Sequence, residues 1–338
     1  MINIIYRLIS PKFFEEAIDD IELDGVVVRP TYLSICQADQ RYYQGSRPPE
    51  VLSQKLPMAL IHEAVGEVVH DSKNIFAHGD SVVMIPNTPG GEDCYKANYS
   101  TSSKFRGSGY DGFTSDLVNL SHDRLVKIPE DFDLKVSSFI ELMSVAYQGI
   151  MKFMEFKKAS CDVLGVWGDG NLGYITSLLL KEIFPDCEVI VFGKHSENLN
   201  LFSFVDNVYM IHNVPEDLRV DHGFECVGSA ASQSAINQII DLINPQGTIN
   251  LFGVSEYPIP INTRMLLEKG LTVQGNSRSE REDFEGVVDL LNENPQLFSY
   301  LSKLITNVCE IKSIDDLKSA FDKDHISNFG KTILKWEI

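Results

Sequence analysis

The stretch Asp162-Val163-Leu164-Gly165-Val166-Trp167-Gly168-Asp169-Gly170-Asn171-Leu172-Gly173 decides the fold. An apolar run ends in a glycine-rich turn, and a helical pattern continues to Ile183. In such a turn the first glycine permits the bend, the second lets the backbone approach a pyrophosphate, and the third lets the helix pack on the sheet. Gly168, Gly170 and Gly173 therefore predict a dinucleotide site, with Asn171 and Leu172 at the helix N-terminus that faces the pyrophosphate. The alternative is a tight strand-to-helix turn that binds no ligand.

Strand and helix patterns alternate on both sides of this turn. Apolar runs at 188–192, 223–227 and 248–252 read as strands, and 232–243 reads as a helix. This alternation predicts an α/β fold with a Rossmann-type, doubly wound parallel sheet. Short β-like runs dominate the first 145 residues, typical of a mainly β domain. We expect a catalytic domain at 1–145, a dinucleotide-binding domain at 146–285, and a C-terminal segment, 286–338, that returns to the catalytic domain.

Composition excludes several classes of protein. The 338 residues are 43% hydrophobic, which is enough for sizeable cores, and the formal charge of −19 argues against a nucleic-acid partner. No apolar run is long enough to cross a bilayer, so no membrane partner is expected. The six cysteines form no Cys-x-x-Cys pair, which makes a disulfide framework unexpected. With no secretion signal at the N-terminus, we expect a cytoplasmic protein.

The residues after the second strand of the nucleotide-binding domain indicate which cofactor is bound. NAD-binding chains place Asp or Glu there, against the ribose 2′-hydroxyl. Here Phe192 is followed by Gly193, Lys194 and His195, so no carboxylate repels a 2′-phosphate and Lys194 can pair with one. The pattern favours NADP(H). The alternative reading of Lys194 is a solvated surface lysine.

Four residues of the first half have the chemistry of a catalytic zinc site. Cys36, His62, Glu63 and Glu141 provide a thiolate, an imidazole and two carboxylates. Taken singly, Cys36 also suits a small buried apolar position, and adjacent His-Glu pairs are common. Their order upstream of a nucleotide fold supports the metal reading. A Lewis acid and a hydride carrier would then act on the same substrate, as in a zinc-dependent dehydrogenase or carbonyl reductase.

The chain resembles the zinc-dependent medium-chain dehydrogenase/reductase family. The resemblance lies in Cys36-Gln37-Ala38-Asp39, His62-Glu63-Ala64-Val65-Gly66, Gly79-Asp80-Ser81-Val82-Val83, Asp111-Gly112-Phe113 and Ile140-Glu141-Leu142-Met143-Ser144-Val145. It implies that the mainly β domain is GroES-like.

The same resemblance assigns roles to single residues. Cys36, His62 and Glu63 would bind zinc, Glu141 would be a fourth ligand or would hold a zinc-bound water, and Asp39 would orient His62. Arg281 resembles a family arginine near the cofactor pyrophosphate.

The chain also departs from the family. The family's lobe of four close cysteines is absent, so one Zn²⁺ per chain is expected. Ile61 replaces a glycine before the histidine, which is expected to shift the local backbone. Ala38 replaces a hydroxyl residue that relays protons, so proton delivery needs another route, such as Glu141, Glu63, water or the substrate.

A narrower resemblance is to the ribulose-5-phosphate reductases, carried by residues 35–43, 102–113 and 277–284. It implies NADPH-dependent reduction of D-ribulose 5-phosphate to D-ribitol 5-phosphate, feeding CDP-ribitol for teichoic acid in cell wall biogenesis or for a capsule. It also implies a complex with a ribitol-5-phosphate cytidylyltransferase. A homodimer is expected.

The sugar phosphate needs cations. Arg41, Lys104 and Arg106 are the candidates, with Tyr110 as a hydrogen-bond partner; each cation could equally be a solvated loop charge. Two other functions stay open: a zinc polyol dehydrogenase acting on an unphosphorylated sugar alcohol such as sorbitol, and a noncatalytic NADPH-binding protein on the same fold.

Overall fold

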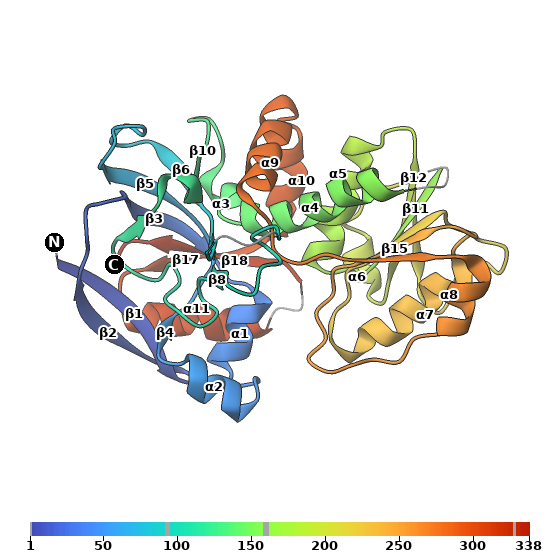
Figure 1. Ribbon diagram of the computed structural model, residues 1–338, viewed down its shortest axis with the longest axis horizontal. Coiled ribbons are helices and arrows are strands. Elements are labelled where there is room, and N and C mark those ends of the chain that lie inside the picture. The colour runs from blue at the N-terminus through green and yellow to red at the C-terminus, as the bar shows by residue number, and fades with distance from the viewer. Residues whose placement is uncertain (1, 92–94, 158–161, 327–328) are drawn as a thin grey trace. The chain divides into compact units, whose positions relative to one another are not determined.

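The computed structural model describes residues 2–91, 95–157, 162–326 and 329–338, which form two compact units (Figure 1). Unit 1 comprises Met1–Ser144 and Arg278–Ile338, and unit 2 comprises Val145–Ser277. The second boundary between the units lies between Ser277 and Arg278, which is earlier in the sequence than the expected boundary at 285. Residues just after Ser277 belong to unit 1 because Ser279 Oγ hydrogen-bonds Ser144 Oγ at 2.7 Å, and because the helix that begins at Arg281 packs against a strand of unit 1.

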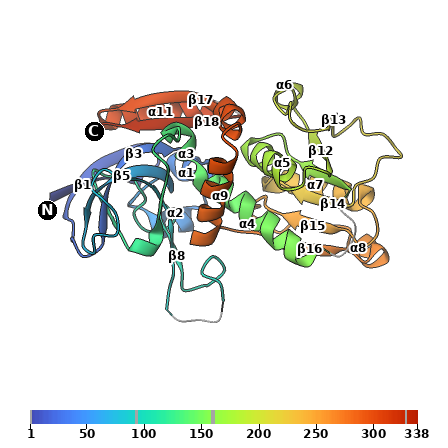
Figure 2. The same ribbon diagram turned by 90° about the horizontal axis from the view of Figure 1, so that it is seen from above.

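The main sheet of unit 1 joins the two ends of the chain. Its strand order is β10-β6-β5-β3-β18-β17, and β9 also pairs with β3. The last strand, β18, is antiparallel to β3 and parallel to β17, so it lies in the interior of the sheet (Figure 2). The bounds are β3 Val26–Ser34, β5 Glu63–Asp71, β6 Ser81–Met84, β9 Val118–Leu120, β10 Leu125–Lys127, β17 Ile305–Ile311 and β18 Lys331–Trp336.

Two smaller sheets and several short helices complete unit 1. One sheet has the order β2-β1-β4 and the other pairs β7 with β8. The strands are β1 Ile2–Ser10, β2 Phe13–Asp20, β4 Met58–Ala59, β7 Asn87–Thr88 and β8 Lys104–Phe105. The helices are α1 Gln37–Tyr43, α2 Pro49–Lys55, α3 Leu134–Ser137, α9 Arg281–Glu293, α10 Leu297–Leu301 and α11 Ile314–Ile326, while α4 Ile140–Phe156 crosses the division between the units.

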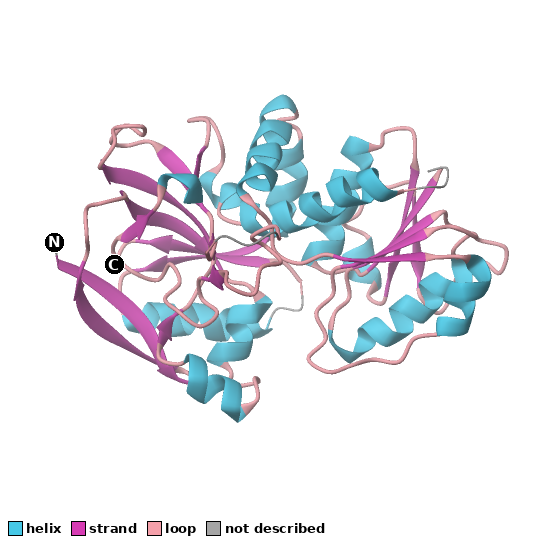
Figure 3. Ribbon diagram, viewed as in Figure 1, coloured by secondary structure: helices cyan, strands magenta, loops and turns pink. Residues whose placement is uncertain are grey.

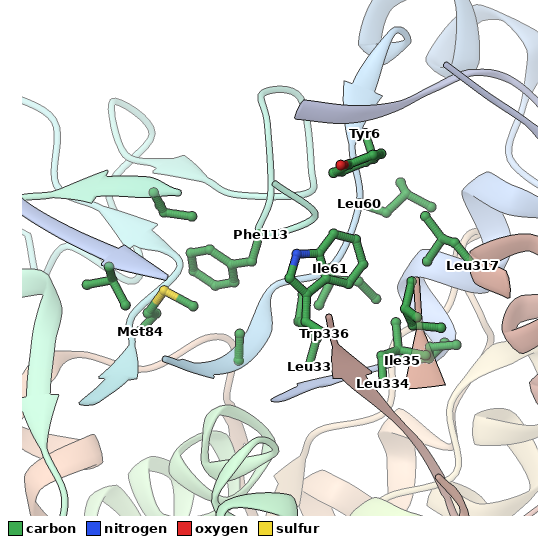
Figure 4. Packing of buried hydrophobic residues seen from close by; sticks show 14 of the residues in the cluster. Tyr6, Leu33, Ile35, Leu60, Ile61, Met84, Phe113, Leu317, Leu334 and Trp336 are labelled. Carbon is green, nitrogen blue, oxygen red and sulfur yellow. The ribbon is translucent and has the colours of Figure 1, made fainter. Parts of the chain in front are cut away.

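The core of unit 1 mixes residues from both of its segments. Tyr6, Ile61 and Phe113 come from the first segment, and Trp336 comes from β18 (Figure 4). The Tyr6 and Trp336 rings meet edge-on with centroids 5.4 Å apart, and the Trp336 indole N–H donates to the Ser115 carbonyl at 3.0 Å. Burial of these large apolar surfaces holds the C-terminal segment on the first one.

Unit 2 is a parallel sheet with the strand order β13-β12-β11-β14-β15-β16. This is the doubly wound order, in which the direction of connection reverses beside the first strand. Figure 3 shows helices on both sides of the strands. The strands are β11 Val163–Trp167, β12 Glu188–Gly193, β13 Asn207–Met210, β14 His222–Glu225, β15 Thr248–Leu251 and β16 Thr272–Gly275; the helices are α5 Asn171–Ile183, α6 Ser196–Leu199, α7 Ser232–Leu242 and α8 Thr263–Lys269.

Two further expectations can be compared with the described residues. None of their helices combines the length and apolar character that a bilayer crossing requires. Cys36, Cys187, Cys226 and Cys309 are free thiols, whereas Cys94 and Cys161 lie outside the described residues.

Close packing of α5 on β11 depends on Gly173. A β-carbon there would overlap the carbonyl oxygen of Gly168. Such overpacking costs typically about 1–3 kcal/mol, so we expect Gly173→Ala to lower the thermal midpoint of the cofactor-free protein. Gly170→Ala is the matched control, because a β-carbon at Gly170 meets no atom within 4 Å. An unchanged midpoint for Gly173→Ala in differential scanning calorimetry would contradict this reading.

Candidate functional site

The register of two strands brings the predicted metal ligands together. Ser34 at the end of β3 pairs with Glu63 at the start of β5. The chain leaves β3 at Ser34 and begins α1 after Cys36, while His62 directly precedes β5. One antiparallel pair therefore sets Cys36 beside His62 and Glu63, although the sequence separates them.

Cys36, His62 and Glu63 form a compact donor cluster. Their ligand atoms all lie within 4.8 Å of one another, and His62 and Glu63 are buried while Cys36 is half-buried. A thiolate, an imidazole and a carboxylate are the donors that zinc takes in catalytic sites, where three protein ligands leave one position open. The donor set therefore suits the metal that the sequence predicts.

Asp39 connects the parts of this cluster. Its carboxylate accepts the Cys36 N–H at 3.0 Å and the Ile61 N–H at 3.0 Å, and one oxygen lies 3.5 Å from His62 Nδ1. Nε2 is then the ring nitrogen that remains for a metal. Burial opposes a charge on His62, but Asp39 and the Cys36 thiolate raise the pKa of the imidazole well above its ordinary value. A site that attracts a proton to His62 in this way would also attract a cation.

Ile61 has a backbone conformation that glycine adopts more easily than isoleucine. Its φ is +69°, in the left-handed region, and its side chain is fully buried. The expected shift of the local backbone relative to the family stays a prediction. The cost of that conformation is of order 1–3 kcal/mol, and the surrounding structure must offset it. The hydrogen bond from Ile61 N–H to Asp39 and the packing of the side chain in the core contribute to that.

Lys331 is a buried cation that the sequence did not indicate. Its Nζ lies 2.9 Å from Glu63 Oε1 and 2.7 Å from Oε2, and it donates to the Ile35 carbonyl at 3.0 Å. Burial alone would lower the pKa of Lys331, but the charges of Glu63 and Cys36 raise it. Because β18 pairs with β3, a residue near the end of the chain supplies the counter-charge for Glu63.

Glu141 is buried near the start of α4. It is not one of the three residues that form the donor cluster among the described residues. Burial raises the pKa of its carboxyl to about 7, and Glu63 adds to this, while His62 and Lys331 act in the opposite direction. Glu141 therefore interacts electrostatically with residues of the cluster. Its role as a fourth ligand or as the holder of a bound water stays a prediction.

The candidate phosphate residues lie in different surroundings. Lys104 is exposed on β8, and Arg41 is half-buried on α1. Arg106 donates to the carbonyls of Asp111 at 3.1 Å and Asn119 at 3.3 Å. Its guanidinium lies 5.3 Å from the ring centroid of Tyr110, whose hydroxyl is 2.7 Å from Thr88 Oγ1.

Arg106 and Tyr110 line a cavity of about 330 Å³ with Asp19, Asp20 and Glu22. These acidic neighbours and the two carbonyl contacts favour a structural role for Arg106. Its part in binding a phosphate stays a prediction.

Arg278 is a second cation that the sequence did not single out. Its guanidinium lies 5.1 Å from the Phe105 ring centroid, and that ring lies 5.3 Å from the His62 ring. Burial lowers the pKa of Arg278 from its usual value. Nothing in the spacing of the sequence connects residue 278 with residue 62, so only a resemblance in the 277–284 run pointed to this segment.

In unit 2 the glycine-rich turn lies at the carboxyl end of β11. Gly168 has φ +133°, and Gly170 precedes the first residue of α5 without a side chain to cap it. The N–H groups at the N-terminus of α5 are thus directed toward the region beside Gly170. This region is open, because a β-carbon on Gly170 would meet no atom within 4 Å. Backbone donors and this open space fit a pyrophosphate.

A cavity of about 580 Å³ adjoins this turn and the end of β12. Gly168, Gly170, Lys194, His195 and His212 are among its lining residues. Asp169 also lines it, but its carboxylate accepts the Lys194 N–H at 2.7 Å and the His195 N–H at 2.6 Å. Asp169 is thus engaged by backbone donors and lies 3.1 Å from His195 Nδ1, while Lys194 adds a basic group.

The absence of a side chain at Gly193 matters for packing as well as for the cofactor preference. A β-carbon there would lie 2.7 Å from Asp169 Cβ and 2.7 Å from Leu199 Cδ2. Replacing Gly193 with Asp would therefore disturb the turn, so Lys194 is the better position at which to test the cofactor preference.

Arg281 lies in unit 1 at the start of α9. Its Nε donates to Glu285 Oε1 at 2.7 Å, and Nη1 donates to the His122 carbonyl at 2.9 Å. These contacts account for its position within unit 1. Its part in binding the cofactor stays a prediction.

Two family models match the chain. The alcohol dehydrogenase GroES-like domain matches residues 22–130, and the zinc-binding dehydrogenase model matches residues 196–293. The expected combination of a GroES-like domain and a Rossmann-type domain is confirmed.

Similarity to known proteins extends over the full chain. Ribulose-5-phosphate reductase 1 of Staphylococcus aureus is 52% identical over 99% of both chains, and the ribulose-5-phosphate reductase of Bacillus spizizenii is 49% identical over 100% of both. The crystal structure of S. aureus TarJ in complex with NADPH superposes with a TM-score of 0.91 at 48% identity, covering 100% of each chain. With its donor cluster and its dinucleotide turn in place, the chain belongs to the ribulose-5-phosphate reductase family of zinc-binding dehydrogenases.

Proposed function

We propose that this chain reduces D-ribulose 5-phosphate to D-ribitol 5-phosphate with NADPH at a zinc centre. The observation that carries the proposal is the cluster of Cys36, His62 and Glu63 in a chain of this family. The product would supply CDP-ribitol for teichoic acid or capsule synthesis.

One Zn²⁺ per chain would be held by Cys36, His62 and Glu63, with Glu141 in or beside the shell and Asp39 orienting His62. Bound there, zinc supplies a Lewis acid for the C2 carbonyl, and NADPH supplies the hydride. Lys331 balances the charge of Glu63 in a buried site. Glu141 is our candidate for holding the proton that the product alkoxide needs, because its carboxyl has a pKa of about 7.

The cofactor would lie in unit 2. Gly170 leaves room for its pyrophosphate, Gly168 and Gly173 shape the turn and the contact of the helix with it, and the first residues of α5, Asn171 and Leu172, provide backbone donors. Lys194 would pair with the 2′-phosphate. Arg281 is a further candidate for the pyrophosphate, for which it would have to leave Glu285.

The assembly and location are also proposals. We propose a homodimer through the open edge of β16, where Val273 and the nearby Leu267 are exposed. A complex with a ribitol-5-phosphate cytidylyltransferase follows from the family resemblance, as does a cytoplasmic location with access to NADPH.

The proposal predicts discrimination by the phosphate. NADPH oxidation should be fast with D-ribulose 5-phosphate and at least tenfold less efficient with D-ribulose, because charge-assisted hydrogen bonds to the phosphate are worth about 1.5–3 kcal/mol each. Steady-state assays with both ketoses, and with D-fructose for the polyol alternative, measure this. Equal efficiency with ribulose and its phosphate would support the polyol reading, and no turnover with any of these ketoses would support a noncatalytic protein.

Removal of the thiolate should remove the metal. We expect Cys36→Ser to lose zinc and activity while it keeps its fold, since the ligands come from separate segments and the core does not depend on the thiol. Cys309→Ser is the matched control, because Cys309 is also a half-buried free thiol of unit 1. Zinc content by mass spectrometry and far-ultraviolet circular dichroism are the readouts. A zinc content near one in the Cys36 variant, or two in the native chain, would exclude this site.

The cofactor preference should depend on Lys194. Lys194→Ala should lower kcat/KM for NADPH by about tenfold or more, through loss of a charged hydrogen bond to the 2′-phosphate. NADH lacks that phosphate, so its kcat/KM serves as the internal control and should change little. A parallel decrease for both cofactors would assign Lys194 to the fold of the turn rather than to the 2′-phosphate.

A further inference from the structure

The strongest unassigned feature is the side chain of Arg278, next to the metal cluster in unit 1. Both contact the same aromatic ring: the Arg278 guanidinium lies 5.1 Å from the Phe105 centroid, and the Phe105 ring lies 5.3 Å from that of His62. Stacking on an aromatic face holds a guanidinium in place and leaves its N–H edge available.

Arg278 lacks a polar partner within the described part of the chain. It is half-buried, yet its guanidinium forms no hydrogen bond or ion pair there, apart from an electrostatic interaction with Tyr110. In a chain with 48 acidic and 29 basic residues, a partly desolvated arginine without a carboxylate is unusual. Desolvating such a charge is unfavourable unless an anion compensates for it.

The backbone of Arg278 is held in an unfavourable conformation. Its φ is +57°, a region that costs a non-glycine residue of order 1 kcal/mol or more. The next residue is anchored, since Ser279 is buried and its Oγ lies 2.7 Å from Ser144 Oγ. Glu280 and Asp283 then form a capping box at the start of α9. The segment is thus fixed from its C-terminal side, which restricts where the arginine can project.

The other cations of this region are less suitable for an anion. Both terminal nitrogens of Arg106 donate to backbone carbonyls, and its cavity carries four acidic residues. Lys104 is exposed on β8, where water competes for its charge.

We propose that Arg278 binds the phosphate of the substrate and determines the preference for a phosphorylated ketose. The proposal rests on the proposed function. In ribulose 5-phosphate, carbons C3 to C5 and an ester oxygen separate the phosphorus from the C2 carbonyl, so the phosphate must lie near the metal cluster but not at it. Arg278, one ring away from His62, meets that requirement and offers bidentate donors to the dianion.

Two variants of the full-length, zinc-containing enzyme test this. Arg278→Gln removes the charge, and Arg278→Gly removes it at a φ that glycine adopts without strain, so at least the glycine variant should fold. We expect kcat/KM for D-ribulose 5-phosphate to fall by about 10- to 100-fold, mainly through KM, while kcat/KM for D-ribulose stays the same. Arg278→Lys should restore part of the loss. Arg264→Gln is the control, since Arg264 is an exposed arginine of unit 2 that pairs with Glu268.

Inorganic phosphate provides a second readout. It should inhibit reduction of D-ribulose 5-phosphate competitively in the native enzyme and much less in Arg278→Gln, with zinc content and NADPH affinity unchanged in both. An equal decrease in kcat/KM for ribulose and its phosphate in the Arg278 variants, or no decrease for either, would overturn the assignment of Arg278. The proposed function would not be affected by that result. If the native enzyme does not prefer the phosphorylated ketose, both this inference and the proposed function fail.

Discussion

The candidate metal site depends on the carboxylate of Asp39. It holds the N–H groups of Cys36 and Ile61 and faces His62, so it joins the beginning of α1 to the end of the segment before β5. Without it, the pairing of β3 with β5 would still bring the backbones together, but the ligand directions would not be fixed. The carboxylate is fully buried, and a buried charge must be fully hydrogen-bonded. The geometry of the ligands and the solvation of this charge therefore depend on the same contacts.

A second constraint is the balance of charge around Glu63. Glu63 and Glu141 are buried and Cys36 is half-buried, and the buried cation Lys331 interacts electrostatically with each of them. Removing one partner of a buried pair is typically destabilising by about 3–5 kcal/mol, because the other charge remains unpaired. The same lysine forms an ion pair with Glu63, a candidate metal ligand, so one contact serves both the packing and the charge balance of the site.

The sequence predicts the parts of this enzyme whose chemistry is local. The turn from Gly168 to Gly173 is recognisable because each glycine serves a backbone requirement within a few residues. The candidate ligands His62 and Glu63 are recognisable from adjacent motif residues. Lys331 and Arg278 were not recognisable, because their roles come from strand pairing and ring stacking between distant segments. The boundary between the two units after Ser277 depends on distant residues in a similar way, because Ser279 hydrogen-bonds Ser144.

The interior position of β18 has a consequence for biosynthesis. During translation Glu63 and Cys36 leave the ribosome long before Lys331 is made, and until then the partly formed sheet lacks both its inner strand and the counter-charge of its acidic pocket. A domain whose sheet is completed by a strand from the end of the chain exposes unpaired strand edges until that strand has been synthesised. Such exposed edges favour aggregation and chaperone binding. The dinucleotide-binding unit, by contrast, is continuous in sequence and can fold as soon as its own residues are complete. Nascent chains of this protein should therefore carry a folded nucleotide-binding half beside an unfinished metal-binding half until synthesis is almost over.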